Sequence, residues 1–253
     1  MHVLDQFRLD GRVVVVTGSS SGLGVRFAEA CAQAGADLVL AARRTQLLET
    51  TAELVRQAGR RAVSVATDVA DPKACQNMVD RAMEEFGRVD VLVNNAGIAT
   101  AVPATRETSE QFRKVIDTNL NGAYWAAQAC GRVMKPGSSI VNISSTVGLT
   151  TAGLPQAAYA ASKAGLIGLT RDLALQWGTR KGIRVNALAP GLFRSEMTDQ
   201  YAEGYEESLA PRMVLGRAGH YREIAGTLVW LISDAAGYVT GQTIACDGGF
   251  TIT

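Results

Sequence analysis

The sequence predicts an α/β fold built on one open parallel sheet of seven strands, with helices on both faces. Three observations support this class. Short runs rich in Val, Ile and Ala, such as 12–17 and 138–144, alternate with longer segments of helical periodicity, as in βαβ units. These runs are apolar at consecutive positions, as in strands buried on both faces. A glycine-rich turn joins the first strand to the first helix.

The elements follow one another without interruption. The expected strands are 12–17, 36–42, 61–68, 89–97, 138–144, 183–190 and 242–245. The expected helices are 25–35, which stops at Gly35, then 43–59, 72–87, one long helix 109–134, a helix around Tyr159, and 222–233. No repeat, low-complexity tract or linker divides them, so we expect residues 1–253 to form a single domain.

Composition excludes several classes of function. The chain has 253 residues, is 47% hydrophobic and carries a net charge of +1 with scattered basic residues, so no nucleic-acid surface is expected. The 4 cysteines form no CxxC, which argues against disulfides and metal clusters and favours the cytoplasm. No uncharged run approaches a membrane span, and the charged N-terminus does not resemble a signal peptide. The chain has only 2 histidines, His2 and His220, and His220 lies in a predicted loop. A catalytic triad or metal centre built on histidine is therefore not expected.

The glycine-rich turn TGSSSGLG is the first candidate ligand site. Glycine at a strand-to-helix turn allows close approach of a pyrophosphate, whose charge is met by the N–H groups of the helix start. The spacing GxxxGxG differs from the GxGxxG fingerprint, and such a turn also occurs for purely structural reasons. Its place in the sheet favours a ligand, because parallel sheets bind ligands at the carboxyl ends of their strands. Six such ends carry Gly18, Ala42, Asp68, Asn94, Ser145 and Pro190.

A tyrosine and a lysine four residues apart form the candidate reactive pair. Tyr159 and Lys163 lie in an Ala-rich segment that favours a helix, so both project from one face, about 5–6 Å apart at Cβ. A nearby cation favours the phenolate, and lowering a tyrosine pKa from near 10 by three units requires about 4 kcal/mol. Tyr159 would then exchange a proton with an oxygen that Ser145 also hydrogen-bonds. Alone, the pair is equally an ordinary amphipathic spacing, so its weight depends on the other motifs.

These motifs together resemble the short-chain dehydrogenase/reductase family. TGSSSGLG, NNAG at 94–97, Asn119, Ser145, YAASK and the Pro190–Gly191 pair occur in the family's order over nearly the whole chain. The resemblance implies a doubly wound Rossmann-type sheet with strand order 3-2-1-4-5-6-7. It also implies hydride transfer between a nicotinamide cofactor and an alcohol or carbonyl, as in 3-oxoacyl-carrier-protein reductases and ketone reductases.

The resemblance implies four catalytic residues. Tyr159 is expected to be the acid/base, Lys163 to lower its pKa and hold the nicotinamide ribose, and Ser145 to orient the substrate oxygen. Asn119 matches the asparagine that interrupts the long helix and holds a water in a proton relay; the alternative is an ordinary polar helix residue. The interval from Ser145 to Tyr159 is one residue longer than the commonest family spacing. We favour Ser145 over Ser144 because it directly precedes TVG, as in the family pattern.

The expected cofactor contacts combine the glycine-rich turn, the strand ends and the family positions. They are Gly18, Ser20, Ser21, Gly22, Leu23, Gly24, Arg43, Arg44, Asp68, Val69, Asn95, Ala96, Gly97, Tyr159, Lys163, Pro190, Gly191, Phe193 and Ser195. Ser195 matches the hydroxyl residue that bonds the nicotinamide carboxamide in the family.

The end of the second strand favours NADP(H) over NAD(H). NAD-preferring Rossmann proteins place an acid there, which would repel a 2′-phosphate. This chain has Ala42 followed by Arg43 and Arg44. A charge-assisted hydrogen bond from Arg43 to phosphate is worth about 1.5–3 kcal/mol, enough for roughly 10- to 100-fold preference. The alternative is that both arginines are only the solvated start of a helix.

The segment from about 195 to 219 matches the family's substrate lid. Met197, Tyr201, Leu209 and Met213 would line an apolar pocket or pack the lid onto the domain. No Arg or Lys is obviously placed to receive a substrate carboxylate or phosphate, which favours a neutral or carrier-attached ketone. Gln156, three residues before Tyr159, is similar to the residue at this position in 3-oxoacyl-carrier-protein reductases. An NAD-dependent sugar or polyol dehydrogenase remains the alternative function.

The helix of Tyr159 bears only Lys163, Arg171 and Asp172 as charges through Trp177, too few for a helix with one wet face. We expect another subunit to cover it, and the resemblance implies a homotetramer. A different class of function, a non-catalytic nucleotide sensor, should lack at least one of the four catalytic residues, and all four are present.

Overall fold

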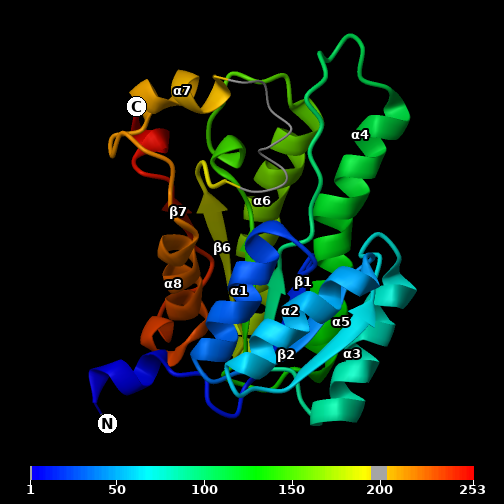
Figure 1. The fold of residues 1–253 in the computed structure, drawn as a ribbon. Coiled ribbons are helices and arrows are strands. Elements are labelled where there is room, and N and C mark those ends of the chain that lie inside the picture. The colour runs from blue at the N-terminus through cyan, green and yellow to red at the C-terminus, as the bar shows by residue number, and fades with distance from the viewer. Residues whose placement is uncertain (1, 195–203) are drawn as a thin grey trace.

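A computed structural model describes residues 2–194 and 204–253, which form a layered α/β structure around one sheet (Figure 1). The seven strands are β1 (Val13–Thr17), β2 (Asp37–Ala42), β3 (Ala62–Ala66), β4 (Val91–Asn94), β5 (Ser139–Ile143), β6 (Arg184–Pro190) and β7 (Thr243–Cys246). All neighbouring pairs are parallel, in the order β3-β2-β1-β4-β5-β6-β7. The predicted fold class and strand order are confirmed.

The central strands are buried on both faces, as their consecutive apolar residues predict. β1, β2, β4 and β5 are buried at every position. In β1, Val15 pairs with Val39 of β2 and Leu92 of β4, so valines and leucines fill the middle of the sheet. β3 lies at the edge and is partly exposed, and it ends at Ala66 rather than at Asp68 as expected.

Helices cover both faces. They are α1 (Gly22–Gln33), α2 (Thr45–Gln57), α3 (Pro72–Phe86), α4 (Ser109–Ile116), α5 (Gly122–Val133), α6 (Ala157–Lys181), α7 (Tyr205–Leu209) and α8 (Tyr221–Ile232). One core joins α1, α2 and α8 to Val14 and Val16 of β1, and the other joins α3, α5 and α6 to Val13 and Val15 (Figure 1). Alternate residues of one strand thus enter opposite cores. No helix in the described part of the chain is long and apolar enough to span a membrane.

The long helix expected over 109–134 is two helices joined by a π-helical turn. α4 begins at a capping box of Thr108 and Gln111 and ends at Ile116. Asp117–Asn121 then takes π-helical geometry before α5 begins at Gly122. A π turn inserts an extra residue, which changes the direction in which the following side chains point. The interruption lies at Asn119, where the resemblance places it.

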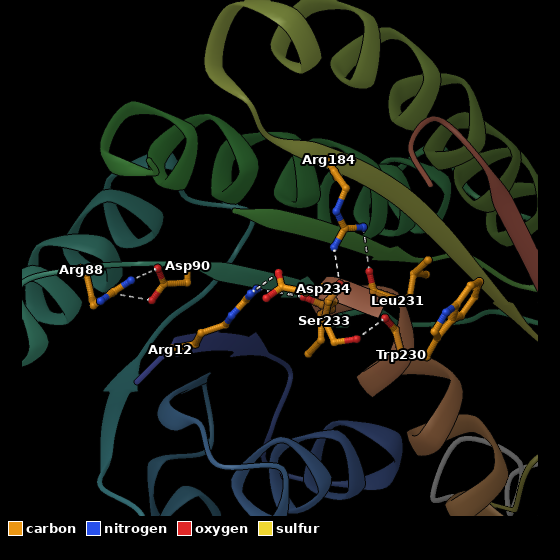
Figure 2. A network of polar contacts seen from close by, with 9 residues as sticks. Arg12, Arg88, Asp90, Arg184, Trp230, Leu231, Ser233 and Asp234 are labelled. Carbon is orange, nitrogen blue, oxygen red and sulfur yellow. Dashed lines mark hydrogen bonds and ion pairs between the residues drawn. The ribbon is translucent and has the colours of Figure 1, made fainter. Parts of the chain in front are cut away.

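The amino end of the sheet is fixed by arginines. The Arg184 guanidinium is partly buried and donates to the carbonyls of Leu231 (2.9 Å), Ser233 (3.0 Å) and Val239 (3.2 Å). Arg12 bonds the carbonyl of Ile232 (3.3 Å) and pairs with Asp234, as Figure 2 shows at the end of α8. Cations at a helix C-terminus satisfy its unpaired carbonyls and its dipole. These contacts fasten the end of α8 to the amino ends of β1 and β6.

Candidate active site

The glycine-rich turn is held against the end of β4. The Thr17 hydroxyl accepts from the backbone N–H groups of Asn95 (3.0 Å) and Ala96 (3.1 Å), and the Asn95 amide donates to the Thr17 carbonyl (2.9 Å). Gly18 has φ +67°, and a Cβ there would lie 2.7 Å from Ala96 Cα. A Cβ on Gly24 would lie 2.3 Å from the Gly18 carbonyl oxygen. Only glycine fits at both positions, so the turn brings bare backbone to the carboxyl end of the sheet.

A cavity of about 540 Å³ opens at this end and collects most of the predicted residues. From the predicted sets its lining includes Gly18, Ser20, Ser21, Gly22, Leu23, Arg43, Arg44, Asp68, Val69, Asn95, Ala96, Gly97, Ser145, Tyr159, Lys163, Pro190, Gly191 and Phe193. Two predicted residues lie elsewhere. Gly24 lies outside the lining and allows α1 to pack on the turn, and Asn119 lies behind the wall. Ser195 is outside the described residues.

Tyr159 and Lys163 project from one face of α6 into this cavity, as their spacing predicts. The Lys163 ammonium nitrogen lies 5.5 Å from the Tyr159 ring centroid and donates to the Ile143 carbonyl at 2.7 Å. Only 4% of Lys163 is exposed. This burial lowers the pKa of Lys163 to about 8, because desolvation penalises the charged form. The group therefore remains mostly an ammonium at neutral pH, yet one that can lose its proton.

Asn119 of the π turn ties three segments together behind the reactive pair. Its side-chain oxygen accepts from the Ile98 N–H at 2.8 Å, and its amide donates to the Ile98 carbonyl at 2.9 Å and to Ser162 at 3.0 Å. The Ser162 hydroxyl in turn donates to the Tyr159 carbonyl at 2.7 Å. A Cβ on Gly97 would lie 3.3 Å from the Asn119 oxygen and 3.5 Å from the Lys163 nitrogen. The asparagine thus lies close to the lysine, and glycine at 97 keeps the space between them open.

The two adjacent serines have different surroundings. Ser144 is buried, and its hydroxyl donates to the Lys163 carbonyl at 2.8 Å, which fastens β5 to α6. The Ser145 hydroxyl is half-buried and accepts from the Val147 N–H at 3.3 Å at the start of a 3-10 turn. Both residues line the cavity. The Ser145 hydroxyl has a proton to donate towards the cavity, whereas that of Ser144 is given to the helix backbone.

The start of α1 and the end of β2 form the opposite part of the cavity. Ser21 precedes α1 without a side-chain capping bond, so the N–H groups of the first turn face a cavity lined by Gly22 and Leu23. Arg44 donates to Ser21 at 2.5 Å and to Ser20 at 3.4 Å. The sequence argument for the 2′-phosphate relied mainly on Arg43, whereas in the structure Arg44 is the arginine bonded to the glycine-rich turn. Bare backbone, a helix start and two arginines fit a phosphorylated dinucleotide.

Other residues of the cavity were missed by sequence reasoning. They are Thr67, Ile98, Ala99, Thr118, Ile143, Thr146, Val147, Ala152, Leu192, Tyr205 and Phe250. Thr67 directly precedes Asp68 and Thr118 directly precedes Asn119, so their proximity to predicted site residues could have identified them from the sequence. Phe250 carried none, because it reaches the cavity only through the tertiary fold. His220, expected in a loop, caps α8 by accepting from the Arg222 N–H at 3.3 Å.

The predicted lid residues divide between two places. Leu209 lines the cavity, whereas Met213 lines a smaller hollow of about 90 Å³ beside it. Both are buried together with Phe250. Met197 and Tyr201 lie outside the described residues. Among those that are described, no group of histidines, cysteines and carboxylates is arranged to hold a metal.

Comparison with known proteins agrees with this geometry. A family model described as enoyl-(acyl carrier protein) reductase matches residues 18–251. The chain is 40% identical to galactitol 2-dehydrogenase (L-tagatose-forming) of Cereibacter sphaeroides over 97% of each chain. It is 37% identical to 3-oxoacyl-acyl-carrier-protein reductase FabG of Thermotoga maritima, over 97% of this chain and 100% of that one.

A solved structure shares the fold over nearly its whole length. It is a short-chain dehydrogenase from Burkholderia cenocepacia J2315 in complex with NADP, with a TM-score of 0.91, 32% identity, and coverage of 96% of this chain and 99% of that one. The chain belongs to the short-chain dehydrogenase/reductase family, oxidoreductases that use a nicotinamide cofactor and act on alcohols or ketones.

Proposed function

We propose that this enzyme transfers a hydride between NADP(H) and a ketone or secondary alcohol, as a carbonyl reductase of the 3-oxoacyl-carrier-protein reductase type. The observation that carries the proposal is the Tyr159–Lys163 pair on the wall of a cavity whose other end suits a dinucleotide. Asn119, Ser145, Tyr159 and Lys163 are its proposed catalytic residues. The active unit is a single domain over residues 1–253, and its free, mostly buried cysteines suit the cytoplasm.

The reduced nicotinamide, when bound, supplies the hydride for the carbonyl carbon. As negative charge grows on the substrate oxygen, Tyr159 donates a proton to it and Ser145 donates a hydrogen bond. Such positioned proton transfer contributes typically about 10²–10⁴ in rate. The Lys163 ammonium favours the phenolate that remains on Tyr159, and Asn119 beside it offers a path for the replacement proton. Oxidation runs the same steps in reverse.

The choice of NADP(H) rests on Arg43 and Arg44 and on the absence of an acid at the end of β2. The Burkholderia relative in complex with NADP supports it. The rival proposal is an NAD-dependent sugar or polyol dehydrogenase, which the similarity to galactitol 2-dehydrogenase favours. The two differ in cofactor, so a cofactor comparison separates them.

The test measures kcat/KM with NADPH and with NADH on a panel of ketones, 3-oxoacyl thioesters and ketoses. Wild type should prefer NADPH by roughly 10- to 100-fold, and Arg44→Ala should remove most of that preference without changing the rate with NADH. Tyr159→Phe should bind nucleotide normally and lose at least about 100-fold in kcat. A preference for NADH would refute the cofactor assignment. Full activity of Tyr159→Phe would refute the mechanism.

The outer face of α6 supports a homotetramer. Ala161, Ala164 and Leu175 are exposed along it, Leu175 by 81%, and a Cβ on Gly168 would meet nothing within 4 Å. Small and apolar residues in a row allow a second helix to pack closely. The mass in solution at micromolar concentration tests this: a tetramer is expected, and a monomer would contradict it.

A further inference from the structure

We propose that the C-terminal segment, through Phe250, forms the wall against which the substrate's substituent packs, and that it selects uncharged ketones with a ring-sized apolar group beside the carbonyl. This inference rests on the proposed hydride transfer at Tyr159. It concerns the part of the cavity beyond the reactive pair, where the chain's C-terminal end lies beside α7 (Figure 1).

Four segments distant in sequence meet there. Ala152 follows the 3-10 turn of Ser145, Leu192 follows β6, Leu209 ends α7, and Phe250 begins the last 3-10 turn. Phe250 is 4% exposed and forms one apolar cluster with Leu209 and Met213. Phe250 therefore adds apolar aromatic surface to the cavity wall, and such surface packs well against an apolar ligand. The wall is thus shaped by the last residues of the chain.

The Phe250 ring is held in a fixed orientation. The Arg212 guanidinium lies 4.0 Å from its centroid and donates to the Thr151 carbonyl at 2.6 Å. The Thr253 hydroxyl donates to the Arg212 carbonyl at 2.8 Å. On the preceding side, the Asp247 carboxylate accepts from the N–H groups of Gly249 (2.9 Å) and Thr251 (2.8 Å).

The part of the lid that follows residue 203 is fastened to the same place. The Tyr205 hydroxyl, at the start of α7, donates to the Ala152 carbonyl at 3.1 Å. Together with Arg212 it ties the lid to the loop after Ser145. The wall therefore exists before the substrate arrives, which spares the free energy of ordering it on binding.

The described side chains of this wall are mainly apolar, and its Tyr205 hydroxyl is bonded to the Ala152 carbonyl. Among the described residues of the lining, the charges are Arg43, Arg44, Asp68 and Lys163, all at the nucleotide end or the reactive pair. A polyol bound against the wall would bury hydroxyls that need partners, each unpaired one costing about 1–3 kcal/mol. A ring in the same place would bury only carbon. We therefore expect this enzyme to prefer a ketone with an apolar ring over the polyols on which some of its relatives act.

The experiment compares acetophenone, 2-butanone and D-fructose as substrates of wild type, Phe250→Ala and Phe250→Leu, with the preferred nucleotide. Wild type should have its highest kcat/KM with acetophenone. Phe250→Ala should lower that value about 10- to 100-fold, mainly through KM, and should change the value for 2-butanone less than about threefold. Phe250→Leu should recover part of the loss. Ile252→Ala, in the same turn but 82% exposed, is the matched control and should resemble wild type.

Other outcomes are distinguishable. An equal loss for all three substrates in Phe250→Ala would overturn the role of Phe250 while leaving the proposed function intact. Preference of wild type for D-fructose would overturn the role of Phe250 and favour the sugar or polyol dehydrogenase, while leaving hydride transfer at Tyr159 intact. If Phe250→Ala does not fold, the same comparison with Phe250→Leu decides, with a loss confined to acetophenone expected. Activity of wild type no higher than that of Tyr159→Phe with every carbonyl would refute the proposed function itself.

Discussion

The buried ammonium of Lys163 should make the free enzyme less stable than it would be without the charge. Lysine has a pKa of about 10.4 in an unfolded chain, whereas the pKa of Lys163 is about 8 in the fold. Between these two values the unfolded chain holds the proton and the folded chain does not, so the free energy of unfolding rises with pH across this window. Below about pH 8 the penalty is complete, and above about pH 10.4 it is absent.

Lys163→Met tests this with a side chain of similar length. A difference of roughly 2.4 pKa units corresponds to about 3 kcal/mol at pH 7. The methionine also gives up the bond to the Ile143 carbonyl, which costs about 1 kcal/mol at every pH. The variant should therefore be more stable than wild type by about 2 kcal/mol at pH 7, or about 4–8 °C in Tm. It should also be nearly inactive, because Tyr159 loses its neighbouring cation.

The assay is thermal unfolding without nucleotide at pH 7 and at pH 10.5. Lys163→Met should be more stable than wild type at pH 7 and less stable at pH 10.5. Above the upper pKa the charge penalty of wild type is absent, so only the hydrogen bond that the variant lacks still affects the difference. Lys114→Met, at an exposed position of α4, should stay within about 0.5 kcal/mol of wild type at both. If Lys163→Met were no more stable than wild type at pH 7, the burial argument would be refuted.

Three further substitutions test the two ends of the sheet: Gly24→Ala at the carboxyl end with Gly178→Ala as its control, and Arg184→Met at the amino end. Gly24→Ala should lower the free energy of unfolding by about 1–3 kcal/mol and weaken nucleotide binding, since its Cβ would meet the Gly18 carbonyl at 2.3 Å. Gly178→Ala in α6, where a Cβ would meet nothing within 4 Å, should instead raise the free energy of unfolding by up to about 1 kcal/mol. Titration with nucleotide and thermal unfolding check both glycine variants. Equal effects of the two substitutions would contradict the packing argument. Arg184→Met should cost about 2–4 kcal/mol by leaving three carbonyls unpaired, and chemical denaturation beside kcat/KM should find stability lowered and activity unchanged.

The sheet could be predicted from the sequence because its signal is local. Consecutive valines in 13–16 indicate a strand buried on both faces, as is typical of parallel sheets, and the structure buries them all. The strand order came with the family resemblance rather than from periodicity. The end of β3 was placed two residues too late, because the pairing of this edge strand with β2 ends at Ala66, opposite Ala42.

The site could be predicted only where its residues are close in sequence to a motif. Helical spacing places Tyr159 and Lys163 together, and the structure keeps that arrangement. The π turn at 117–121 was invisible to periodicity, since the residues on both sides of it form helices. Phe250 and Tyr205 enter the cavity through contacts with residues about 40 to 50 positions away. Such contacts are set by the packing of the lid and the C-terminus, which no local pattern encodes.

The carboxyl end of the sheet combines departures from regular structure, each of which other contacts compensate. Gly18 takes a positive φ, and Thr17 and Asn95 hold it. The π turn disrupts helical bonding at Asn119, whose side chain bonds the Ile98 backbone instead. Irregular backbone of this kind persists only where the surroundings fix it. The two-faced core and the arginines at the amino end supply that rigidity from the far side of the sheet. Substitutions at the carboxyl end should therefore change activity more than stability, and those at the amino end the reverse.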